Sequence, residues 1–332
     1  MSAPAPSLFT PEAAALAESL GLAMGRPNLE TFAAALEELA RADRNVVAVT
    51  SDSRGSGKLG PFGLALPGQI VEVGIAEQNL VGVAAGLASA DKTVFAVSPA
   101  CFLTARSLEQ IKNDVCYSDM PVKLVGISAG VSYGALGSTH HSLHDLAALR
   151  AINNIDIVVP ADNAEARAAV LAAARQARPI YLRFGKAPLY DLPTGDGEFA
   201  VGRARRLRPG TDVAFLATGE TVIHALLAAE RLRRSRGLSC RALSVHTVKP
   251  LDSTAVLAAA RECRAVITVE EHMVHGGLGE GVAALLLQAG VHPSAFRIVG
   301  IPDEYTVTGS QADIFRHYGI SMEGLAARAL EL

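Results

Sequence analysis

Aromatic side chains and net charge are scarce in this sequence. It has no Trp, its aromatic content is 5%, and 30 Lys and Arg residues against 33 Asp and Glu residues leave a formal net charge of −3. Nucleic-acid binding needs a basic surface and often aromatic side chains that stack on bases. The composition therefore predicts no nucleic-acid partner.

Cysteine pairs and long apolar runs are also missing. The four cysteines lie far apart and form no CxxC pair; they are Cys101, Cys116, Cys240 and Cys263. This pattern is typical of buried free thiols. No uncharged apolar run reaches the roughly 18 residues of a membrane span, and residues 1–25 lack the pattern of a signal peptide. We therefore expect a cytoplasmic protein that is not exported and has no membrane partner.

Apolar residues make up 50% of the 332 residues, and they fall in alternating strand and helix patterns. Repeated βα units indicate parallel sheets with helices on both faces, and the length allows two domains. The expected fold is α/β, with two domains that each contain a mostly parallel sheet flanked by helices. Its expected parts are an N-terminal helical extension (1–26), a first domain (27–188), a linker (189–208) and a second domain (209–332).

The expected elements follow this order. Strands of the first domain are expected over residues 45–50, 71–73, 93–97, 122–127, 155–159 and 180–183, and its helices over 28–41, 75–90, 103–117, 144–152 and 163–175. An earlier helix over 11–24 is expected from Thr10 as N-cap and Pro11 as first helical residue. The second domain repeats the pattern, with a final helix over residues 322–330.

Glu77 is the only carboxylate in the nearly apolar helix expected over 75–90, and it stands at the head of that helix. A carboxylate beside apolar walls resists ionisation and can share a proton with a ligand nitrogen. A carboxylate in the first turn can also do no more than complement the helix dipole. Both interpretations stay open on this stretch alone.

Loops with functional residue types follow the expected strands of the first domain. Ligands of open α/β sheets bind at the carboxyl ends of strands. Residues 51–58 are small, polar and charged there, although a flexible surface turn has the same composition. Residues 128–141 hold three glycines and end in STHH, and residues 98–102 and 183–188 form two further loops. Long glycine-bearing loops in compact domains are often functional.

Several short patterns indicate other chemistry only weakly. Residues 276–279 (GGLG) could cradle a phosphate at a helix N-terminus, but they lack GxGxxG spacing and fit a packing turn better. His140, His141 and His144 have only Asp145 as a further ligand type nearby, so we expect no metal site on this chain. The absence of a GxSxG elbow argues against a hydrolase.

Four blocks read together resemble the transketolase family of thiamine diphosphate enzymes. They are residues 73–79 (VGIAEQN), 137–140 (GSTH), 246–252 (HTVKPLD) and 270–277 (EEHMVHGG), and they occur in family order. The likeness covers about residues 27–330 and matches only the pyrimidine-binding and C-terminal domains of a full-length transketolase. It therefore implies a split transketolase, in which this chain is one subunit.

The missing diphosphate-binding domain implies a partner subunit. The metal-diphosphate motif of the family begins with GDG and needs a downstream Asn; this chain has GDG at residues 195–197 but no Asn after position 163. The triplet is therefore expected to be a turn. The resemblance implies thiamine diphosphate as cofactor, with Mg²⁺ held by ligands on an N-terminal, diphosphate-binding partner.

The resemblance also gives roles to residues around Glu77. The matching glutamate of the family hydrogen-bonds the ring nitrogen of the cofactor's aminopyrimidine and favours the tautomer that starts the carbanion chemistry. Phe102 and Arg106 match residues that pack around the pyrimidine, and Asp52 matches an Asp close to the cofactor. His140 matches a histidine that contacts the substrate's carbonyl or hydroxyl region and moves protons, so Glu77 and His140 are the expected catalytic residues.

The substrate end departs from the family pattern. Arg183 and Ser56 match residues that hold the terminal phosphate. However, Leu136 replaces an Asp that reads a sugar hydroxyl, and Ser128 stands where many relatives have a phosphate-contacting His. We therefore expect transfer of a two-carbon ketol unit to an aldose from a ketose with a modified sugar or end group, for instance a sulfonated sugar. Arg54 joins Ser128 and Arg183 as a candidate contact.

The expected assembly is a heterotetramer of two copies of this chain and two of the partner. The resemblance assigns no cofactor residue to the C-terminal domain, which is expected to help hold a dimer, and the Ala/Gly-rich helix after Glu77 allows close helix approach. Three alternatives stay open: a deoxyxylulose phosphate synthase-like activity, a 2-oxoacid dehydrogenase β-subunit-like activity, and a non-catalytic partner subunit.

Overall fold

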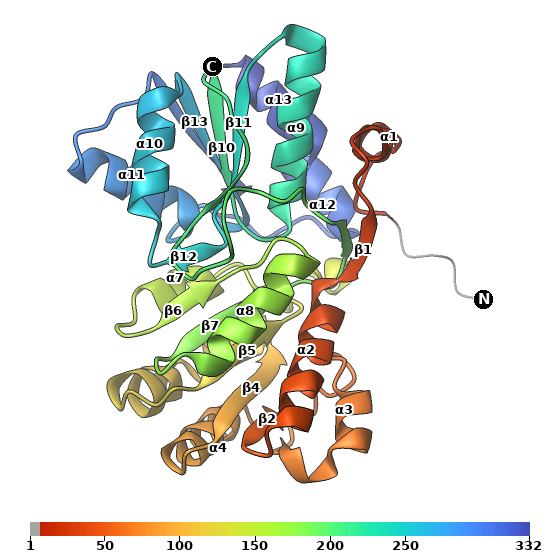
Figure 1. The fold of residues 1–332 in the computed structure, drawn as a ribbon, viewed down its shortest axis with the longest axis vertical. Helices are drawn as coiled ribbons and strands as arrows, with labels where there is room; N and C mark the ends of the chain where they lie inside the picture. The colour runs from red at the N-terminus through yellow and green to blue at the C-terminus, as the bar shows by residue number, and fades with distance from the viewer. Residues whose placement is uncertain (1–6) are drawn as a thin grey trace.

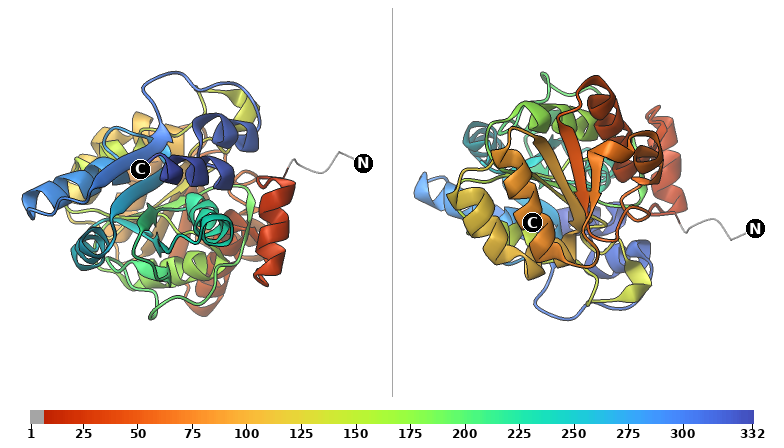
Figure 2. Two further views of the ribbon diagram at one scale, coloured as in Figure 1. Left: turned by 90° about the horizontal axis from the view of Figure 1, so that it is seen from above. Right: turned by 90° about the horizontal axis from the view of Figure 1, so that it is seen from below.

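A computed structural model describes residues 7–332 and shows two α/β domains, one above the other in Figure 1. The lower domain contains a seven-stranded sheet and the upper domain a five-stranded sheet. The two further views in Figure 2 show helices packed around both sheets. The expected two-domain α/β fold is therefore confirmed. None of the helices within residues 7–332 is long and apolar enough to cross a membrane.

The first sheet is parallel except at one edge. Its order is β12-β6-β7-β5-β4-β2-β3, and only β12 runs antiparallel to its neighbour, β6. The central strands are buried on both faces, which explains their continuous apolar runs. The strands are β2 (Val46–Thr50), β3 (Ile70–Glu72), β4 (Thr93–Pro99), β5 (Lys123–Ile127), β6 (Asp156–Val158), β7 (Ile180–Phe184) and β12 (Thr247–Lys249).

Helices cover both faces of this sheet through two separate apolar clusters. On one face α2 and α8 pack on the strands, and the rings of Phe32 and Phe184 stack at 5.3 Å between centroids. On the other face α4, α5, η2 and α7 share a cluster with the alternate strand residues. The helices are α2 (Asn28–Ala42), α3 (Gly60–Ala65), η1 (Pro67–Gln69), α4 (Glu77–Ser89), α5 (Ala100–Arg106), α6 (Leu108–Gln110), η2 (Ile111–Tyr117), η3 (Gly134–Leu136), α7 (Asp145–Arg150) and α8 (Asn163–Arg175).

The single helix expected over residues 103–117 is three helical pieces, α5, α6 and η2, the last a π-helix. The hydroxyls of Thr104 and Ser107 donate hydrogen bonds to the carbonyls four residues earlier, at Ala100 and Leu103. Such bonds compete with the backbone ladder and bend helices. The break at Ser107 places Arg106 at the end of α5.

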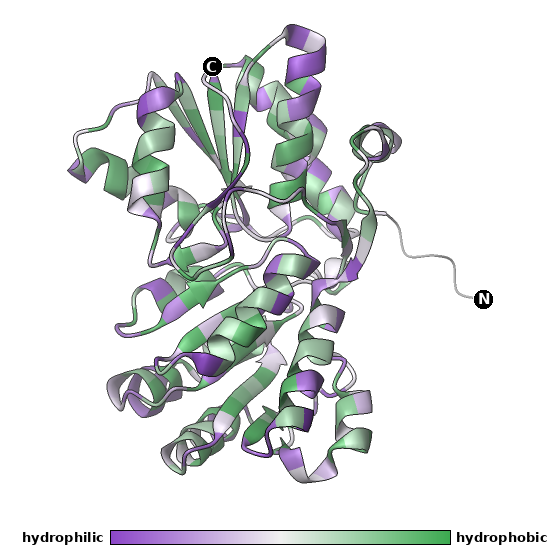
Figure 3. Cartoon of the chain, viewed as in Figure 1, coloured by the Kyte–Doolittle hydropathy of each residue, from purple (hydrophilic) through white to green (hydrophobic). Residues whose placement is uncertain are grey.

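The second sheet has the order β14-β13-β10-β11-β9, and only β9 is antiparallel to its neighbour. α9, α12 and α13 cover one face, and α10 and α11 cover the other. In Figure 3 the strands of both sheets carry the hydrophobic colour, while hydrophilic residues gather on outer helix surfaces and loops. The elements are β9 (Arg205–Arg208), β10 (Val213–Ala217), α9 (Thr221–Arg236), β11 (Cys240–Ser244), α10 (Ser253–Glu262), β13 (Ala265–Met273), α11 (Leu278–Gln288), β14 (Ala295–Ile301), α12 (Gln311–Tyr318) and α13 (Met322–Leu330).

The N-terminal extension and the linker differ from expectation. Helix α1 (Pro11–Ser19) ends before position 24, because Gly21 adopts a left-handed φ of 69°. β1 (Met24–Pro27) then pairs with β8 (Pro188–Tyr190). Within the expected linker 189–208, the last four residues form β9 and belong to the second sheet. Residues 1–6 of the expected extension lie outside the described residues.

The two domains exchange backbone contacts. β12 follows β11 in sequence but completes the first sheet beside β6. The backbone N–H of Val159 donates to the carbonyl of His246 (2.7 Å), and that of Gly219 donates to the carbonyl of Val159 (3.2 Å). Polar backbone groups of the second domain are therefore satisfied by the first, and the loops near this junction are positioned by both domains.

Candidate active site

The carboxyl ends of five parallel strands, β2, β3, β4, β5 and β7, meet at one edge of the first sheet. Three residues in the loops that follow have left-handed backbones although they are not glycine, and Lys58, after β2, is one of them with a φ of 60°. Asp52, after β2, and Ser128, directly after β5, both have a φ of 53°. Such conformations are strained and concentrate at functional sites. This edge therefore has the character of a ligand site.

Glu77 opens helix α4 at this edge. Its side chain is 4% exposed, and Nη1 of Arg106 donates to both of its carboxylate oxygens at 3.1 Å. Residues 75–79 and Arg106 line a cavity of about 450 Å³ in front of it. A nearly buried carboxylate beside open space can bond a polar ring nitrogen of a ligand.

Aromatic rings and cations form a row that begins at Arg106. Its guanidinium carbon lies 4.4 Å from the ring centroid of Phe102. The Phe102 ring meets His140 edge-on at 5.4 Å, and His140 meets Tyr133 at 5.3 Å. Nζ of Lys186 lies 3.9 Å from the Tyr133 centroid. These five residues, the ring row, suit a ligand with a flat ring at one end and an anionic group at the other.

Two members of the ring row, Tyr133 and Lys186, were not singled out by the sequence. Burial lowers the pKa of Lys186, and the nearby charge of Lys58 lowers it further. Burial raises the pKa of Tyr133, and the hydroxyls of Ser128 and Ser56 partly oppose that rise. Both residues lie in loops marked as functional by their place after strands. The sequence therefore predicted the functional loops but not these two residues within them.

The loop after β2 is tied to Glu72. The backbone N–H of Asp52 donates to Oε1 of Glu72 (2.6 Å), and Nε of Arg54 lies 3.4 Å from Oε2 of Glu72. Asp52 and Ser56 are exposed. The hydroxyl of Ser56 lies close enough to Tyr133 to oppose part of the rise in the pKa of its phenol. The structure thus brings Ser56 to the ring row, whereas Arg54 is paired with a carboxylate of its own chain.

Arg183 and Ser128 do not lie where a substrate can reach them. Nε of Arg183 donates to Oδ2 of Asp145 (2.8 Å), and Nη2 donates to the carbonyls of Ser142 (3.0 Å) and Glu271 (2.9 Å). Both side chains of this ion pair are buried, and Ser128 has no exposed surface. The expectation that Arg183 and Ser128 contact the substrate's end group is therefore corrected. Arg183 instead forms an ion pair within the first domain, and its bond to the carbonyl of Glu271 reaches the second domain.

The neighbouring histidines do not form a cluster with His140. Nδ1 of His141 lies 2.7 Å from Oγ1 of Thr306, and Nε2 lies 2.9 Å from the carbonyl of Gly134, so His141 links the two domains. Across residues 7–332 no group of three or more His, Cys, Asp and Glu side chains is placed to hold a metal ion. The four cysteines are buried and unpaired, as expected.

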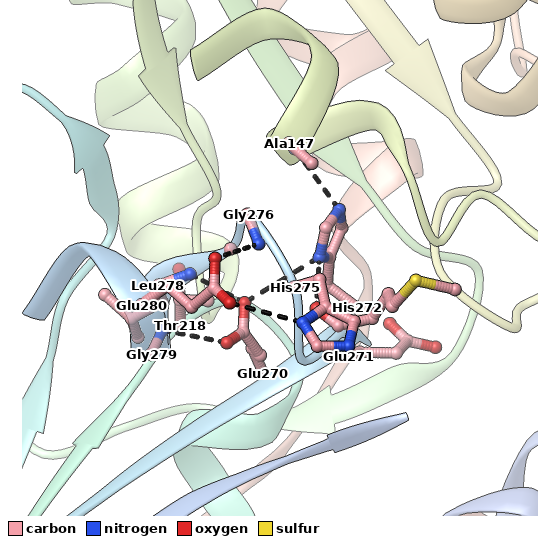
Figure 4. A network of polar contacts seen from close by, with 12 residues as sticks. Ala147, Thr218, Glu270, Glu271, His272, His275, Gly276, Leu278, Gly279 and Glu280 are labelled. Carbon is pink, nitrogen blue, oxygen red and sulfur yellow. Dashed lines mark hydrogen bonds and ion pairs between the residues drawn. The ribbon is translucent and has the colours of Figure 1, made fainter. Parts of the chain in front are cut away.

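Two N–H groups of the turn at residues 276–279 are already bonded to a carboxylate of the same chain (Figure 4). The carboxylate of Glu270 accepts hydrogen bonds from the backbone N–H groups of Leu278 (2.7 Å) and Gly279 (2.8 Å). A Cβ on Gly277 would lie 1.9 Å from Oε2 of Glu270, so only glycine fits there. Burial raises the pKa of Glu270 to about 7. Because this carboxylate occupies the helix N-terminus, the segment is a packing turn and not a phosphate cradle.

The site fits one part of a cofactor only. Glu77 offers a carboxylate, and Phe102 offers a ring near it, a pair that suits an amino-bearing heterocycle such as an aminopyrimidine. The described residues offer no cluster that would hold a metal bound to a diphosphate.

Two family models match the chain. Residues 26–190 match the transketolase pyrimidine binding domain, and residues 202–325 match the transketolase C-terminal domain. Together they leave uncovered only the N-terminal segment, a short connection and the last few residues.

Curated relatives are similar over nearly the whole chain. It is 48% identical over 303 residues to an apulose-4-phosphate transketolase subunit of Phocaeicola vulgatus, covering 91% of this chain and 96% of the relative. It is 35% identical over 303 residues to a 6-deoxy-6-sulfo-D-fructose transketolase subunit of Clostridium sp., covering 91% and 93%. The 1-deoxy-D-xylulose-5-phosphate synthase of Thermomicrobium roseum is 37% identical over 304 residues, which are 91% of this chain but 48% of that protein.

Solved structures show the same relation. A split gene transketolase, described as an inactive beta4 tetramer, superposes with a TM-score of 0.81 at 34% identity, covering 92% of this chain and 98% of that one. The transketolase from Leishmania mexicana superposes with a TM-score of 0.80 at 19% identity and is covered to 46%, a likeness of fold alone.

Proposed function

The chain belongs to the transketolase family, and from this we propose that it is the pyrimidine-binding subunit of a split, thiamine diphosphate-dependent transketolase. It spans 96% of the Phocaeicola vulgatus relative, which is itself named as one subunit of a transketolase, but 46% of the transketolase from Leishmania mexicana. A chain of this extent holds the pyrimidine half of an active site and depends on a partner for the rest.

The observation that carries the proposal is the buried carboxylate of Glu77 facing a half-open cavity. Thiamine diphosphate, when bound, supplies the carbanion centre that takes up the two-carbon ketol unit. Glu77 holds a proton at the ring nitrogen of the aminopyrimidine through a carboxylate oxygen. Arg106 donates to both carboxylate oxygens and, with its guanidinium over the ring of Phe102, closes the side of the pocket. Asp52 lies in the neighbouring loop on the same edge.

His140 is proposed to move protons at the substrate's oxygen atoms. Its ring is fixed by edge contacts to Phe102 and Tyr133, and its Nδ1 lies 3.0 Å from Oγ1 of Thr139. That contact leaves Nε2 to face a ligand. A ring held on two sides and bonded at one nitrogen presents the other nitrogen in a fixed direction, which proton transfer requires.

The partner subunit supplies the diphosphate site and the Mg²⁺ ligands in this proposal. Support comes from the half-site geometry and from the match along 96% of a relative that is itself a transketolase subunit. Two copies of this chain and two of the partner form the assembly; the small residues Gly82 and Gly86 on the outer side of α4 allow another chain to approach closely. A non-catalytic role fits poorly with an intact ring row. A deoxyxylulose phosphate synthase-like activity fits poorly with a chain half as long as those relatives.

The substrate is proposed to be a ketose with a modified skeleton and an anionic end group. Two relatives are named for apulose 4-phosphate and for 6-deoxy-6-sulfo-D-fructose, sugars that each carry such a group, and the first relative is 48% identical to this chain. Lys186 takes the place that Arg183 was expected to have, because its ammonium is in the ring row and half-buried. Lys58 and Ser56 lie close enough to add charge and a hydroxyl.

The test is reconstitution with the diphosphate-binding partner, thiamine diphosphate and Mg²⁺. Apulose 4-phosphate, sulfofructose and xylulose 5-phosphate are compared as ketol donors with one aldose acceptor. We expect activity only with both subunits and a preference for one of the two modified ketoses. A preference for xylulose 5-phosphate would contradict the substrate assignment. Condensation of pyruvate with an aldehyde would replace the transketolase assignment by the synthase-like one.

A further inference from the structure

Two carboxylates of the second domain reach the substrate loops of the first. Glu220 precedes α9 and Glu271 lies on β13, and both are buried. Neighbouring residues on a strand point to opposite faces. Figure 4 accordingly shows Glu271 directed away from its neighbours Glu270 and His272. Glu271 is therefore separate from the turn that Glu270 caps.

One amide group joins the two carboxylates. Nε2 of Gln311, the first residue of α12, donates to Oε2 of Glu220 (2.6 Å) and to Oε1 of Glu271 (2.9 Å). Gln311 also lines a cavity of about 430 Å³ together with Tyr133 and Lys186. The acidic pair is thus adjacent to the substrate end of the ring row.

Each carboxylate contacts one loop of the first domain, Glu271 through a hydrogen bond and Glu220 through close packing. The backbone N–H of Val131 donates to Oε1 of Glu271 (2.9 Å). The backbone N–H of Ala187 faces Glu220 and partly opposes the rise in its pKa that burial causes. Tyr133 follows Val131 by two residues, and Lys186 directly precedes Ala187. The two contacts therefore act next to the two residues of the cation–ring pair.

Two glycines allow this approach. A Cβ on Gly130 would lie 2.1 Å from Cδ of Glu271, and a Cβ on Gly185 would lie 1.9 Å from Oε1 of Glu220. Only glycine fits at these positions, because any side chain would overlap the carboxylates of the second domain. The second domain therefore packs tightly against both loops of the first domain.

We propose that Glu220, Glu271 and Gln311 form an interdomain clamp that positions Tyr133 and Lys186 for the anionic end of the donor. The substrate assigned to the clamp rests on the proposed function, whereas the contacts that form the clamp do not. Its members are positioning residues, because they act through the loops and do not touch the ring row themselves. In this way the second domain, which supplies no cofactor residue, contributes to substrate specificity.

The electrostatics make the clamp responsive to pH. Burial raises the pKa of both carboxyls, and the charge of Glu271 raises that of Glu220 further. Arg183 opposes the rise in both, and Asp145 adds to it at Glu271. Two adjacent buried carboxylates resist double ionisation, so the pair keeps one proton at neutral pH. Loss of that proton adds repulsion and loosens both loops.

The kinetic test compares variants in the reconstituted complex. For wild type we expect KM for the anionic donor to rise about threefold or more between about pH 6.5 and 8.5, with kcat nearly constant. Glu220→Gln keeps the shape and removes one ionisation, so its KM should stay flat over this range. A short ketose without an anionic end should show no difference between the two proteins. Glu270→Gln, on the same strand but facing the other way, is the control and should follow wild type.

A second measurement does not depend on activity. In the isolated chain at one pH, Glu220→Ala and Glu271→Ala should speed hydrogen–deuterium exchange in residues 129–134 and 184–187, whereas Glu270→Ala should speed it only at the start of α11. Wild-type exchange in those loops for the first two variants would overturn the clamp. An inactive wild-type complex with the expected exchange would instead contradict the proposed function and leave the clamp standing. Equal pH dependence of KM in wild type and Glu220→Gln would refute its role in specificity.

Discussion

Nη1 of Arg106 lies 3.1 Å from each carboxylate oxygen of Glu77. The guanidinium is half exposed while the carboxylate is almost fully buried. One nitrogen thus bridges both oxygens that a ligand could use, and a ring nitrogen must share or displace that contact. Under the proposed function, the bridge would link cofactor binding to the conformation of Arg106 and, through Phe102, to the ring row.

Glu77→Gln should abolish most of the activity. The amide keeps the shape but cannot exchange a proton with the ring nitrogen, and general acid–base groups contribute about 10²- to 10⁴-fold to rate. The measurement is kcat of the reconstituted complex, with the thermal midpoint of the chain as a check on folding. Glu198→Gln, on an exposed loop, is the matched control. Full activity in Glu77→Gln would disprove the central role of this residue.

Arg106→Ala should weaken cofactor binding and lower stability modestly. It removes the partner of a buried carboxylate, which costs about 3–5 kcal/mol in fully buried pairs. Because Arg106 is half exposed and water can replace it, we expect about 1 kcal/mol. Denaturant unfolding and titration of thiamine diphosphate in the complex measure the two effects. If the loss arises from the unpaired carboxylate, Glu77→Gln combined with Arg106→Ala should be more stable than Arg106→Ala alone. Equal stability of the two variants would contradict this explanation.

Lys186→Ala should raise KM for the anionic donor by about tenfold, since a charge-assisted contact contributes about 1.5–3 kcal/mol before solvent replaces part of it. kcat and the thermal midpoint should change little, because the side chain is only half-buried. Lys186→Arg should restore most of the affinity. An unchanged KM in Lys186→Ala would show that the end group binds elsewhere.

Arg183→Ala should act on the fold and not on the substrate. It leaves Asp145 buried without its cation, which costs about 3–5 kcal/mol. Tyr181 still donates to Oδ2 of Asp145 (2.8 Å) and limits the loss. Equilibrium unfolding checks the size of the effect. A variant of wild-type stability with a raised KM would return Arg183 to the substrate site.

The free energy of unfolding should fall as pH rises from about 6.5 to 8. Burial raises the pKa of Glu165 and Glu270 from 4.5 to about 7, so the unfolded chain ionises these groups first and folding loses free energy as pH rises through this range. Burial lowers the pKa of His224 and His272 to about 4, an effect that raises stability with pH only up to about their unfolded pKa of 6.5. Glu270→Gln should flatten the fall. Thermal midpoints at the two pH values test this, and a rise in wild type would contradict it.

Local sequence patterns were sufficient for the fold and for the edge of the sheet at which the candidate functional loops lie. Alternating strand and helix patterns give two parallel sheets, because periodicity reflects which faces are buried. The rule that ligands bind at the carboxyl ends of strands marked the loops that hold Asp52 and His140. Glu77 drew attention as a lone carboxylate at the head of an apolar helix, and His140 was singled out by the resemblance. Phe102 and Arg106 followed from the resemblance, and the structure joins them to Glu77.

Contacts between distant residues decided the rest. Whether an arginine near the end of a strand faces solvent or an aspartate cannot be read from its neighbours in sequence. Arg183, in β7, pairs with Asp145 across 38 positions, and Lys186 contacts Tyr133 instead. The exchange of β12 into the first sheet and the approach of Glu220 and Glu271 to glycines of the other domain are equally non-local. The sequence by itself determined which elements form and where their loops meet, because those depend on local burial. Only the tertiary structure decided which charges are buried and paired, because that depends on contacts between residues that are distant in sequence.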